Sequence, residues 1–415
     1  MFNKLKNKLL IFSHNLKYGF KSIFWKKDKT CVLFDSWFGV KFADNPRYLY
    51  QYLSENRRQL GLSHVVWVTH SEQVLNTLHE MNYEAYLIDS KESVHYHKIS
   101  KYHFVNNAPI GKGKLTGELL ADYSYRSKRI NLWHGTGVIK NVGFASNDYK
   151  KKTQKFASLY KFKNELYKRS YVLKKFITEL GPWADNYFLT TSLTEKEKIK
   201  EFFCLSDKRI ITSGYPRDSY SCRYTPYEEE IVNQIKEYST VILYLPTFRT
   251  VSDKFSMNEL SDAIAPKIKD SNILFIQKAH SAANDQTKFS FKNNVLNLNP
   301  DFDINVITPL TSIVITDYSS ILADAMYFRK PVILYAPDYE EYVNDDRGLA
   351  TDAEYILSAS YRFGDKYELI NYVMENYKTP EKMKKVNYDE VRKRIWGNQD
   401  KDISIIWKDI LEQTR

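Results

Sequence analysis

The sequence predicts an α/β protein built from two doubly wound domains, each with a parallel sheet. Its 415 residues exceed the usual size of one domain, so two domains of roughly 190 residues are expected. Short apolar, β-branched stretches alternate with helix-like stretches along most of the chain, as in parallel sheets with helical crossovers. With 43% hydrophobic and 27% charged residues, collagenous, low-complexity and largely disordered chains are excluded.

The expected elements form two series, and each series corresponds to one domain. The first has strands at 31–35, 65–69, 85–88, 102–106, 130–133 and 187–190, and helices near 46–59, 71–81 and 193–203. The second has strands at 241–245, 273–277, 313–316 and 332–335, and helices near 228–237, 259–269 and 319–328. Gly214-Tyr215-Pro216-Arg217 separates the series as a turn. We therefore expect domains at 30–220 and 221–415, the second ending in C-terminal helices, with a cleft between the two.

The net charge of +11 is concentrated in two short stretches. Residues 1–29 carry +7 and residues 150–175 carry +9, which leaves −5 for the rest of the chain. In the first stretch, apolar residues from Phe2 to Ile23 recur every three or four positions, as on one face of a helix. Lysines cover the rest, so 1–29 is predicted to be an amphipathic helix that lies on an anionic membrane surface without spanning it.

The second basic stretch, 149–176, interleaves aromatic side chains with lysines, a mixture typical of the headgroup zone of a membrane. The same mixture is also compatible with single-stranded nucleic acid, bound by stacking and phosphate contacts. A solvated helix with a buried aromatic seam is a third interpretation. We favour a membrane partner and expect no nucleic acid, because a nucleic-acid module would not explain two histidines that follow expected strands.

These two histidines occupy the strand ends where open α/β sheets bind ligands. His134 lies in Trp133-His134-Gly135-Thr136, a tight glycine turn after the strand 130–133. His280 follows the strand 273–277. Both are candidate catalytic residues, although a single histidine is more often structural.

Two further loops contain residues that favour the binding of phosphate. Thr247 and Arg249 follow the strand 241–245 and supply a hydroxyl and a guanidinium, which grips phosphate oxygens. Asp317, Ser319 and Ser320 lie where the strand 313–316 runs into a helix, whose N-terminus attracts anions. The same Asp and Ser side chains are equally compatible with simple helix capping.

Motifs of several other enzyme classes are missing from the sequence. It contains no Walker-type phosphate loop, no G-x-G-x-x-G and no H-E-x-x-H, which counts against ATPases, dinucleotide enzymes and zinc proteases. Its three cysteines, Cys31, Cys204 and Cys222, lack the number and spacing of a disulfide framework or a zinc site. We therefore expect no metal and no cofactor, and a cytoplasmic location.

Several motifs in order resemble the CDP-glycerol glycerophosphotransferase family of wall teichoic acid and related capsule synthesis, over roughly residues 31–350. They are Asp35-Ser36-Trp37-Phe38-Gly39, Asp44-Asn45-Pro46, Trp133-His134-Gly135-Thr136, Gly214-Tyr215-Pro216-Arg217, Pro246-Thr247-Phe248-Arg249, Lys278-x-His280, Thr316-Asp317-Tyr318-Ser319-Ser320 and Asp338-Tyr339-Glu340-Glu341-Tyr342. The resemblance implies a GT-B fold and a peripheral enzyme at the cytoplasmic face of the bacterial cell membrane. It also implies transfer of glycerol or ribitol phosphate from a CDP-alditol to a lipid-linked polyprenyl-diphosphate glycan, with release of CMP.

The candidate residues fit this chemistry. His134 would be the general base, and His280, Arg249, Ser319 and Ser320 would offset phosphate charge. Thr247 and Asp317 would position the phosphates or the histidine, and Glu341 would hold the CMP ribose. Gly135, Thr136, Asp44 and Arg217 form an acceptor-side or structural motif. A GT-B glycosyltransferase that uses a nucleotide sugar is the competing function, and a membrane scaffold without catalysis is a weaker one. The choice between glycerol and ribitol, between primase and polymerase, and the oligomeric state stay open.

Overall fold

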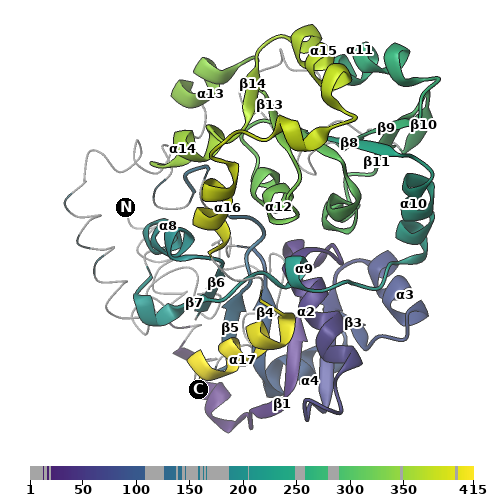
Figure 1. The fold of residues 1–415 in the computed structure, drawn as a ribbon. Coiled ribbons are helices and arrows are strands. Elements are labelled where there is room, and N and C mark those ends of the chain that lie inside the picture. Colours follow the sequence, from purple (N-terminus) through teal and green to yellow (C-terminus); the bar gives the residue numbers. More distant parts are fainter. Residues whose placement is uncertain are drawn as a thin grey trace, which may run out of the picture. The chain divides into compact units, whose positions relative to one another are not determined.

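The computed structural model divides the chain into two compact units (Figure 1). The first comprises residues 1–134, 155–223 and 400–415, and the second comprises 135–154 and 224–399. The structure describes residues 13, 16–17, 20–107, 126–136, 139–142, 145, 158, 162, 165, 187–203, 205–247, 258–278, 289–345, 349–397 and 401–415. The amphipathic helix expected at 1–29 and the basic aromatic stretch at 149–176 therefore lie largely outside the described residues.

The first unit is built on a seven-stranded parallel sheet. Its strand order is β3-β2-β1-β4-β5-β6-β7, with neighbours paired in parallel throughout. This is the order of a doubly wound fold, in which the chain moves outward from β1 in both directions. The strands are β1 (Asp28–Phe34), β2 (His64–Thr69), β3 (Ala85–Leu87), β4 (Ser100–Val105), β5 (Lys128–Asn131), β6 (Tyr187–Thr190) and β7 (Ile210–Thr212).

Most helices of the first unit lie between its strands in the chain, and some of them begin at a side-chain cap. They are α2 (Asp44–Glu55), α3 (Glu72–Glu80), α4 (Lys91–Ile99), α8 (Leu193–Phe203), α9 (Pro216–Ser219) and α17 (Ile403–Gln413). The hydroxyls of Ser71 and Ser90 accept backbone N–H groups at the starts of α3 and α4. Although α17 is the last element, it packs on the first unit (Figure 1). There the ring of Trp407 contacts Tyr102 and Phe104 of β4.

The second unit repeats the same plan. Its sheet order is β10-β11-β9-β8-β12-β13-β14, and only the β10–β11 pair is antiparallel. The strands are β8 (Thr240–Leu245), β9 (Ile273–Lys278), β10 (Ser290–Lys292), β11 (Val295–Leu298), β12 (Ile313–Thr316), β13 (Val332–Tyr335) and β14 (Tyr361–Phe363). The helices are α10 (Pro226–Lys236), α11 (Asn258–Ile268), α12 (Ile321–Tyr327), α13 (Tyr339–Asp345), α14 (Ala353–Leu357), α15 (Lys366–Asn376) and α16 (Tyr388–Trp396).

All of the expected strands are present, and the strands that were missed are short. The strands that were not expected are β7, β10 and β14, with three residues each, and β11, with four. The limits of the two compact units also differ from those of the expected domains. Residues 135–154, expected in the first domain, belong to the second unit, and residues 400–415, expected in the second domain, belong to the first.

A buried histidine predicts how the stability of the first unit depends on pH. His97 on α4 is fully buried, and its Nδ1–H donates to the carbonyl oxygen of Ser93 at 2.7 Å. Burial lowers the pKa of His97 to about 4, below its usual value near 6.5. The unfolded chain therefore binds this proton at a higher pH than the folded chain does. The contribution of neutral His97 to the free energy of unfolding is fully present above pH 6.5 and is lost as the pH falls toward 4.

We expect the free energy of unfolding to fall by about 2 kcal/mol more in the wild type than in His97→Gln between pH 7.5 and pH 5. Urea unfolding of both proteins at the two pH values measures this difference, and other titrating groups cancel in the comparison. Equal losses in the two proteins would show that His97 does not take up a proton on unfolding.

Candidate functional site

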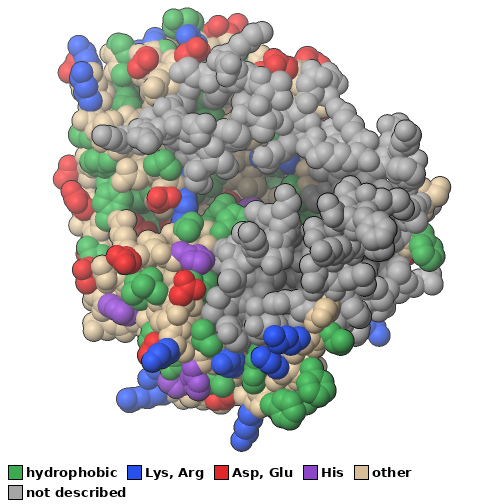
Figure 2. Space-filling model, turned by 180° about the vertical axis from the view of Figure 1, so that it is seen from behind, with side chains coloured by type: hydrophobic (Ala, Val, Ile, Leu, Met, Phe, Trp, Pro, Cys, Tyr) green, Lys and Arg blue, Asp and Glu red, His purple; other side chains and the backbone are tan. Residues whose placement is uncertain are grey.

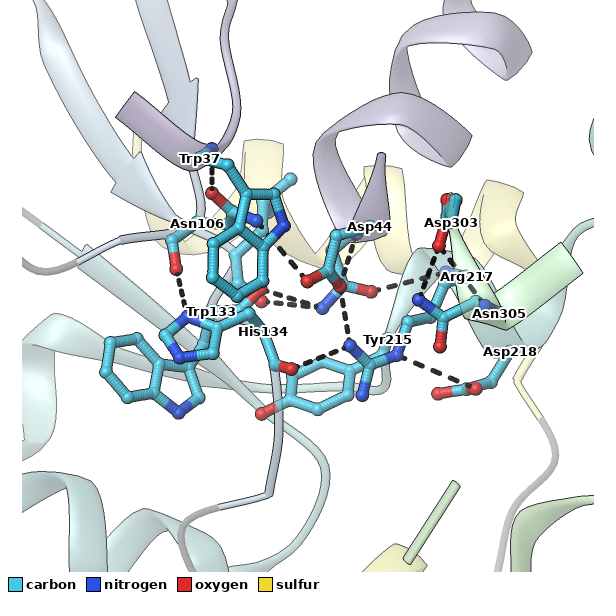
Figure 3. A network of polar contacts seen from close by, with 12 residues as sticks. Trp37, Asp44, Asn106, Trp133, His134, Tyr215, Arg217, Asp218, Asp303 and Asn305 are labelled. Atoms are coloured by element: carbon cyan, nitrogen blue, oxygen red, sulfur yellow. Dashed lines mark hydrogen bonds and ion pairs between the residues drawn. The ribbon is translucent and has the colours of Figure 1, made fainter. Parts of the chain in front are cut away.

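His134 lies just beyond the carboxyl end of β5, and its imidazole is oriented by a backbone carbonyl. Nδ1 is 2.7 Å from the carbonyl oxygen of Asn106, which follows β4 (Figure 3). Because a carbonyl oxygen only accepts, Nδ1 carries the proton, and Nε2 is the basic nitrogen of the neutral ring. The rings of Trp37 and Trp133 contact the half-buried imidazole, with centroids at 5.0 and 4.2 Å.

A buried ion pair supports the backbone of His134. Nη1 of Arg217 donates to Oδ1 of Asp44 at 2.5 Å and to the carbonyl oxygen of His134 at 2.9 Å (Figure 3). The side chains of Arg217 and Asp44 are 1% and 4% exposed. Nδ2 of Asn45 donates to the carbonyl oxygens of Leu132 and Trp133, both at 3.0 Å. The predicted residues Asp44, His134 and Arg217 are thus brought together within the first unit.

Backbone strain is concentrated around this histidine. Trp37, Phe38, Asp44 and Trp133 all have positive φ, between 48° and 65°. Residues other than glycine rarely adopt this conformation, and when they do so in a group they are often part of a functional site. Oδ1 of Asn131 accepts the N–H of Trp133 at 2.8 Å and so supports one of the strained positions.

The next two residues of the motif, Gly135 and Thr136, belong to the second unit. A Cβ at Gly135 would lie 2.5 Å from Oγ of Ser320, which also belongs to that unit, so no larger residue fits without a shift. The side chain of Thr136 is buried, and its hydroxyl has no hydrogen-bond partner among the described residues. Nearby, the N–H of Ala350 donates to the carbonyl oxygen of Ile139 at 2.8 Å.

In the second unit, Thr247 and Asp317 meet at the point where the strand order reverses, between β8 and β12. The carboxylate of Asp317 accepts hydrogen bonds from the N–H of Thr247 at 2.9 Å and from the hydroxyl of Thr247 at 2.6 Å. It also accepts the N–H of Tyr318 at 2.6 Å. Asp317 is 1% exposed. In doubly wound sheets this reversal point is where ligands bind, so the two predicted residues lie at the expected position.

The comparisons with known proteins agree with one another. Residues 18–405 match the family described as CDP-Glycerol:Poly(glycerophosphate) glycerophosphotransferase. The chain belongs to this family. It is 24% identical over 368 residues to the teichoic acid poly(glycerol phosphate) polymerase of Bacillus spizizenii, covering 84% of this chain and 86% of that protein. It is also 24% identical over 361 residues to the teichoic acid glycerol-phosphate transferase of Staphylococcus aureus, covering 82% and 83%.

The solved structure of the wall teichoic acid polymerase TagF matches this glycerophosphotransferase with a TM-score of 0.67 and 19% identity, over 100% of both chains. The predicted fold class, α/β and GT-B-like with two doubly wound parallel sheets, is therefore confirmed. The enzyme class predicted from the motifs, a CDP-glycerol glycerophosphotransferase, is confirmed as well.

The helix after β12 differs from the expectation for this glycerophosphotransferase. We expected it to begin near Ser319, whereas α12 begins at Ile321 and has seven residues. Ser320 precedes it in a helical backbone conformation, and its side chain does not cap the helix. An N-terminal cap has an extended conformation, whereas Ser320 has φ −63° and ψ −15°.

The remaining predicted residues are only partly described. Glu341 lies on α13 and is exposed. His280 and Arg249 lie outside the described residues. Within the described part of the chain, no group of three or more His, Cys, Asp or Glu side chains is placed to hold a metal ion.

Several residues of the His134 site were not expected from the sequence. Asn106, Asn45 and Trp37 all contribute hydrogen bonds. Trp37 and Asn45 lie in motifs named above but received no role there, and Asn106 lies in none of those motifs. Oε1 of Glu195 accepts the hydroxyl of Tyr215 at 2.6 Å, while Arg217 lies over the Tyr215 ring at 5.3 Å. The positions of Trp37 and Asn106 in the sequence could have indicated a role, because they follow β1 and β4, and ligands bind at the carboxyl ends of such strands.

Proposed function

We propose that this enzyme transfers glycerol phosphate or ribitol phosphate from a CDP-alditol to a lipid-linked polyprenyl-diphosphate glycan, with His134 as the general base. The observation that carries the proposal is the orientation of His134. Its Nδ1–H is committed to the carbonyl oxygen of Asn106, so Nε2 is the nitrogen able to accept a proton. Imidazole is the side-chain group best suited to taking up a proton at neutral pH.

In the proposed reaction, Nε2 of His134 takes the proton from the terminal hydroxyl of the acceptor. The hydroxyl oxygen attacks the β-phosphorus of the donor, a new P–O bond forms, and the bond from that phosphorus to the oxygen of CMP breaks. CMP leaves with the electron pair, and the proton passes from the imidazolium to water. The reaction needs no redox partner, and positioning with charge stabilisation supplies the catalysis.

On the donor side we assign phosphate contacts to Thr247, Ser319, Ser320, Arg249 and His280. Asp317 acts by holding Thr247, because a carboxylate repels phosphate and this one already accepts three protein donors. Glu341 is assigned to the ribose of CMP, and its exposure on α13 leaves it accessible. The hydroxyl of Thr136 is assigned to the acceptor side.

The test is incubation of the purified protein with CDP-glycerol or CDP-ribitol and a synthetic lipid-linked acceptor. We expect CMP and an acceptor that is heavier by whole alditol phosphate units, with mass spectrometry giving the number of units. Release of a nucleoside diphosphate from a nucleotide sugar, without CMP from either CDP-alditol, would favour a glycosyltransferase instead.

We also propose that the enzyme docks on the cytoplasmic face of the membrane through basic surfaces. No helix in the described ranges is long and apolar enough to cross a bilayer. Lys29, Lys101 and Lys128 lie at the amino ends of three neighbouring strands, β1, β4 and β5, and Arg209 directly precedes β7. Burial lowers the pKa of Lys128, and the positive charges of Lys101, Arg209 and Lys29 lower it further.

Apolar side chains lie next to this basic edge. Arg126, just before β5, donates to the carbonyl oxygens of Ser22 and Ile23 at 3.1 and 2.9 Å. Ile23 and Phe24 of that segment are 59% and 77% exposed. At the lower edge of Figure 2, Lys and Arg side chains likewise lie beside exposed apolar ones. Basic and apolar side chains together suit the interface of an anionic bilayer.

We expect Lys29→Glu combined with Lys128→Glu to weaken binding to vesicles of 30% phosphatidylserine by about tenfold or more, since each lysine near such a surface contributes about 1 kcal/mol. Co-sedimentation measures the binding. Lys236→Glu, an exposed reversal on α10, is the matched control and should change it little. Unchanged vesicle binding of the double variant would contradict the assignment, and loss of RNA binding instead would point to nucleic acid.

A further inference from the structure

We infer that Asp44 is a positioning residue that sets both the tautomer and the orientation of His134. The inference rests on the proposed role of His134 as general base, but its structural part is tested separately. Asp44 acts on His134 through other residues. It contacts the two residues that do the holding, Asn106 and Arg217, and each of them bonds a different part of His134 (Figure 3).

The first route from Asp44 leads to the imidazole. Oδ2 of Asp44 accepts from Nδ2 of Asn106 at 3.4 Å, and Oδ1 of Asn106 accepts the N–H of Trp37 at 2.9 Å. The Asn106 side chain is thereby held at both ends of its amide, and Asn106 is fully buried. Its carbonyl oxygen is the acceptor of Nδ1–H of His134. Because this acceptor cannot donate, its fixed position selects the tautomer with a proton on Nδ1.

The second route leads to the backbone of His134. Oδ1 of Asp44 accepts from Nη1 of Arg217, and the same Nη1 donates to the carbonyl oxygen of His134. Oδ1 also accepts the N–H of Asn45 at 2.9 Å, while the Asn45 side chain holds the two carbonyl groups before His134. One carboxylate therefore organises the whole turn from Leu132 to His134.

A purely stabilising role explains this arrangement poorly. A buried ion pair is weak evidence for stability, because removing both charges from water offsets most of their attraction. Asp44 and Trp133 also hold φ values of 65° and 57°, which cost free energy. Strained backbone of this kind is found at functional sites, where the position of a side chain matters more than stability.

Asp218 provides a matched control. Its carboxylate lies 3.9 Å from Nε of the same Arg217, its side chain is 2% exposed, and it follows Arg217 on α9. Asp44→Asn and Asp218→Asn each remove one buried negative charge beside the same guanidinium. Of the two acids, Asp44 is the one that is hydrogen-bonded to Asn45 and Asn106.

The experiment is long-range ¹H–¹⁵N correlation NMR of the full chain labelled with ¹⁵N-histidine at pH 8, with His134→Gln used to assign the signals. In the wild type and in Asp218→Asn we expect a proton on Nδ1 and a lone pair on Nε2 of His134. In Asp44→Asn we expect a mixture of tautomers. A proton on Nε2 in the wild type, or an unchanged tautomer in Asp44→Asn, would overturn the inference.

Kinetics give the second readout. For Asp44→Asn we expect kcat of CMP release to fall by about 10- to 100-fold, with KM for the CDP-alditol nearly unchanged and a shifted acid limb of the pH–rate profile. A loss carried by KM with an unshifted profile would overturn the positioning role. Full turnover by His134→Gln would instead refute the base assignment, while the tautomer result would still decide whether Asp44 orients the ring.

Discussion

His134→Gln is expected to lower kcat for CMP release by about 10²–10⁴-fold, the range that a general base typically contributes. Glutamine keeps a polar group of similar length but cannot accept a proton at neutral pH. The acceptor hydroxyl would then have to lose its proton to water during attack on phosphorus. The measurement is CMP release under saturating CDP-alditol and acceptor, followed over pH 5.5 to 9, where the wild type should show the titration of an imidazole.

His95→Gln is the control for this prediction. His95 is exposed on α4, in the same unit but away from the end of β5, so the same replacement should leave turnover unchanged. Far-ultraviolet circular dichroism and the thermal midpoint should agree between the two variants, which separates loss of chemistry from loss of fold. Turnover of His134→Gln within a factor of three of the control would exclude His134 as the base.

The central strands were predictable because a strand buried on both faces has a continuous run of apolar residues. β8 reads Thr-Val-Ile-Leu-Tyr-Leu and is buried at all six positions, and β12 and β13 are equally buried. β10 is exposed at all three of its positions and pairs only with β11, so its existence depends on a partner. Residue type alone cannot report a pairing of that kind.

The candidate site was predictable where it follows from strand order and not where it follows from backbone geometry. His134, Thr247 and Asp317 were found because each comes directly after a buried strand. Asn106 acts through its main-chain carbonyl oxygen, which every residue possesses, so nothing in its identity signals this role. The left-handed conformation of Trp133 is likewise invisible in sequence, since tryptophan does not favour it.

Asp317 also acts through a contact that the local sequence does not show. From sequence, an Asp between a strand and a helix indicates either a helix cap or a phosphate site. In the structure its carboxylate faces Thr247, 70 positions earlier in the chain, and joins the ends of β8 and β12. Contacts between distant segments of this kind depend on the sheet being assembled, and local patterns do not contain them.

Asp317→Ala is expected to destabilise the second unit by about 4 kcal/mol, since three buried donors lose their acceptor and each such loss costs about 1–3 kcal/mol. The donors are the N–H and hydroxyl of Thr247 and the N–H of Tyr318, all bonded to a carboxylate that is 1% exposed. Hydrogen exchange measured by mass spectrometry, in increasing urea, should show earlier opening of β8 and β12 than in the wild type, while β1 and β4 keep their protection.

Two smaller changes at the same contact are expected to cause smaller losses of stability than Asp317→Ala. Thr247→Val removes only the hydroxyl donor and should cost about 1 kcal/mol, and Asp317→Asn, which keeps one acceptor oxygen, should fall between this variant and alanine. The order follows from the number of donors that each change leaves without an acceptor. An Asp317→Ala protein as stable as Thr247→Val would mean that the two N–H groups readily find other acceptors, and that Asp317 does not join the two strands.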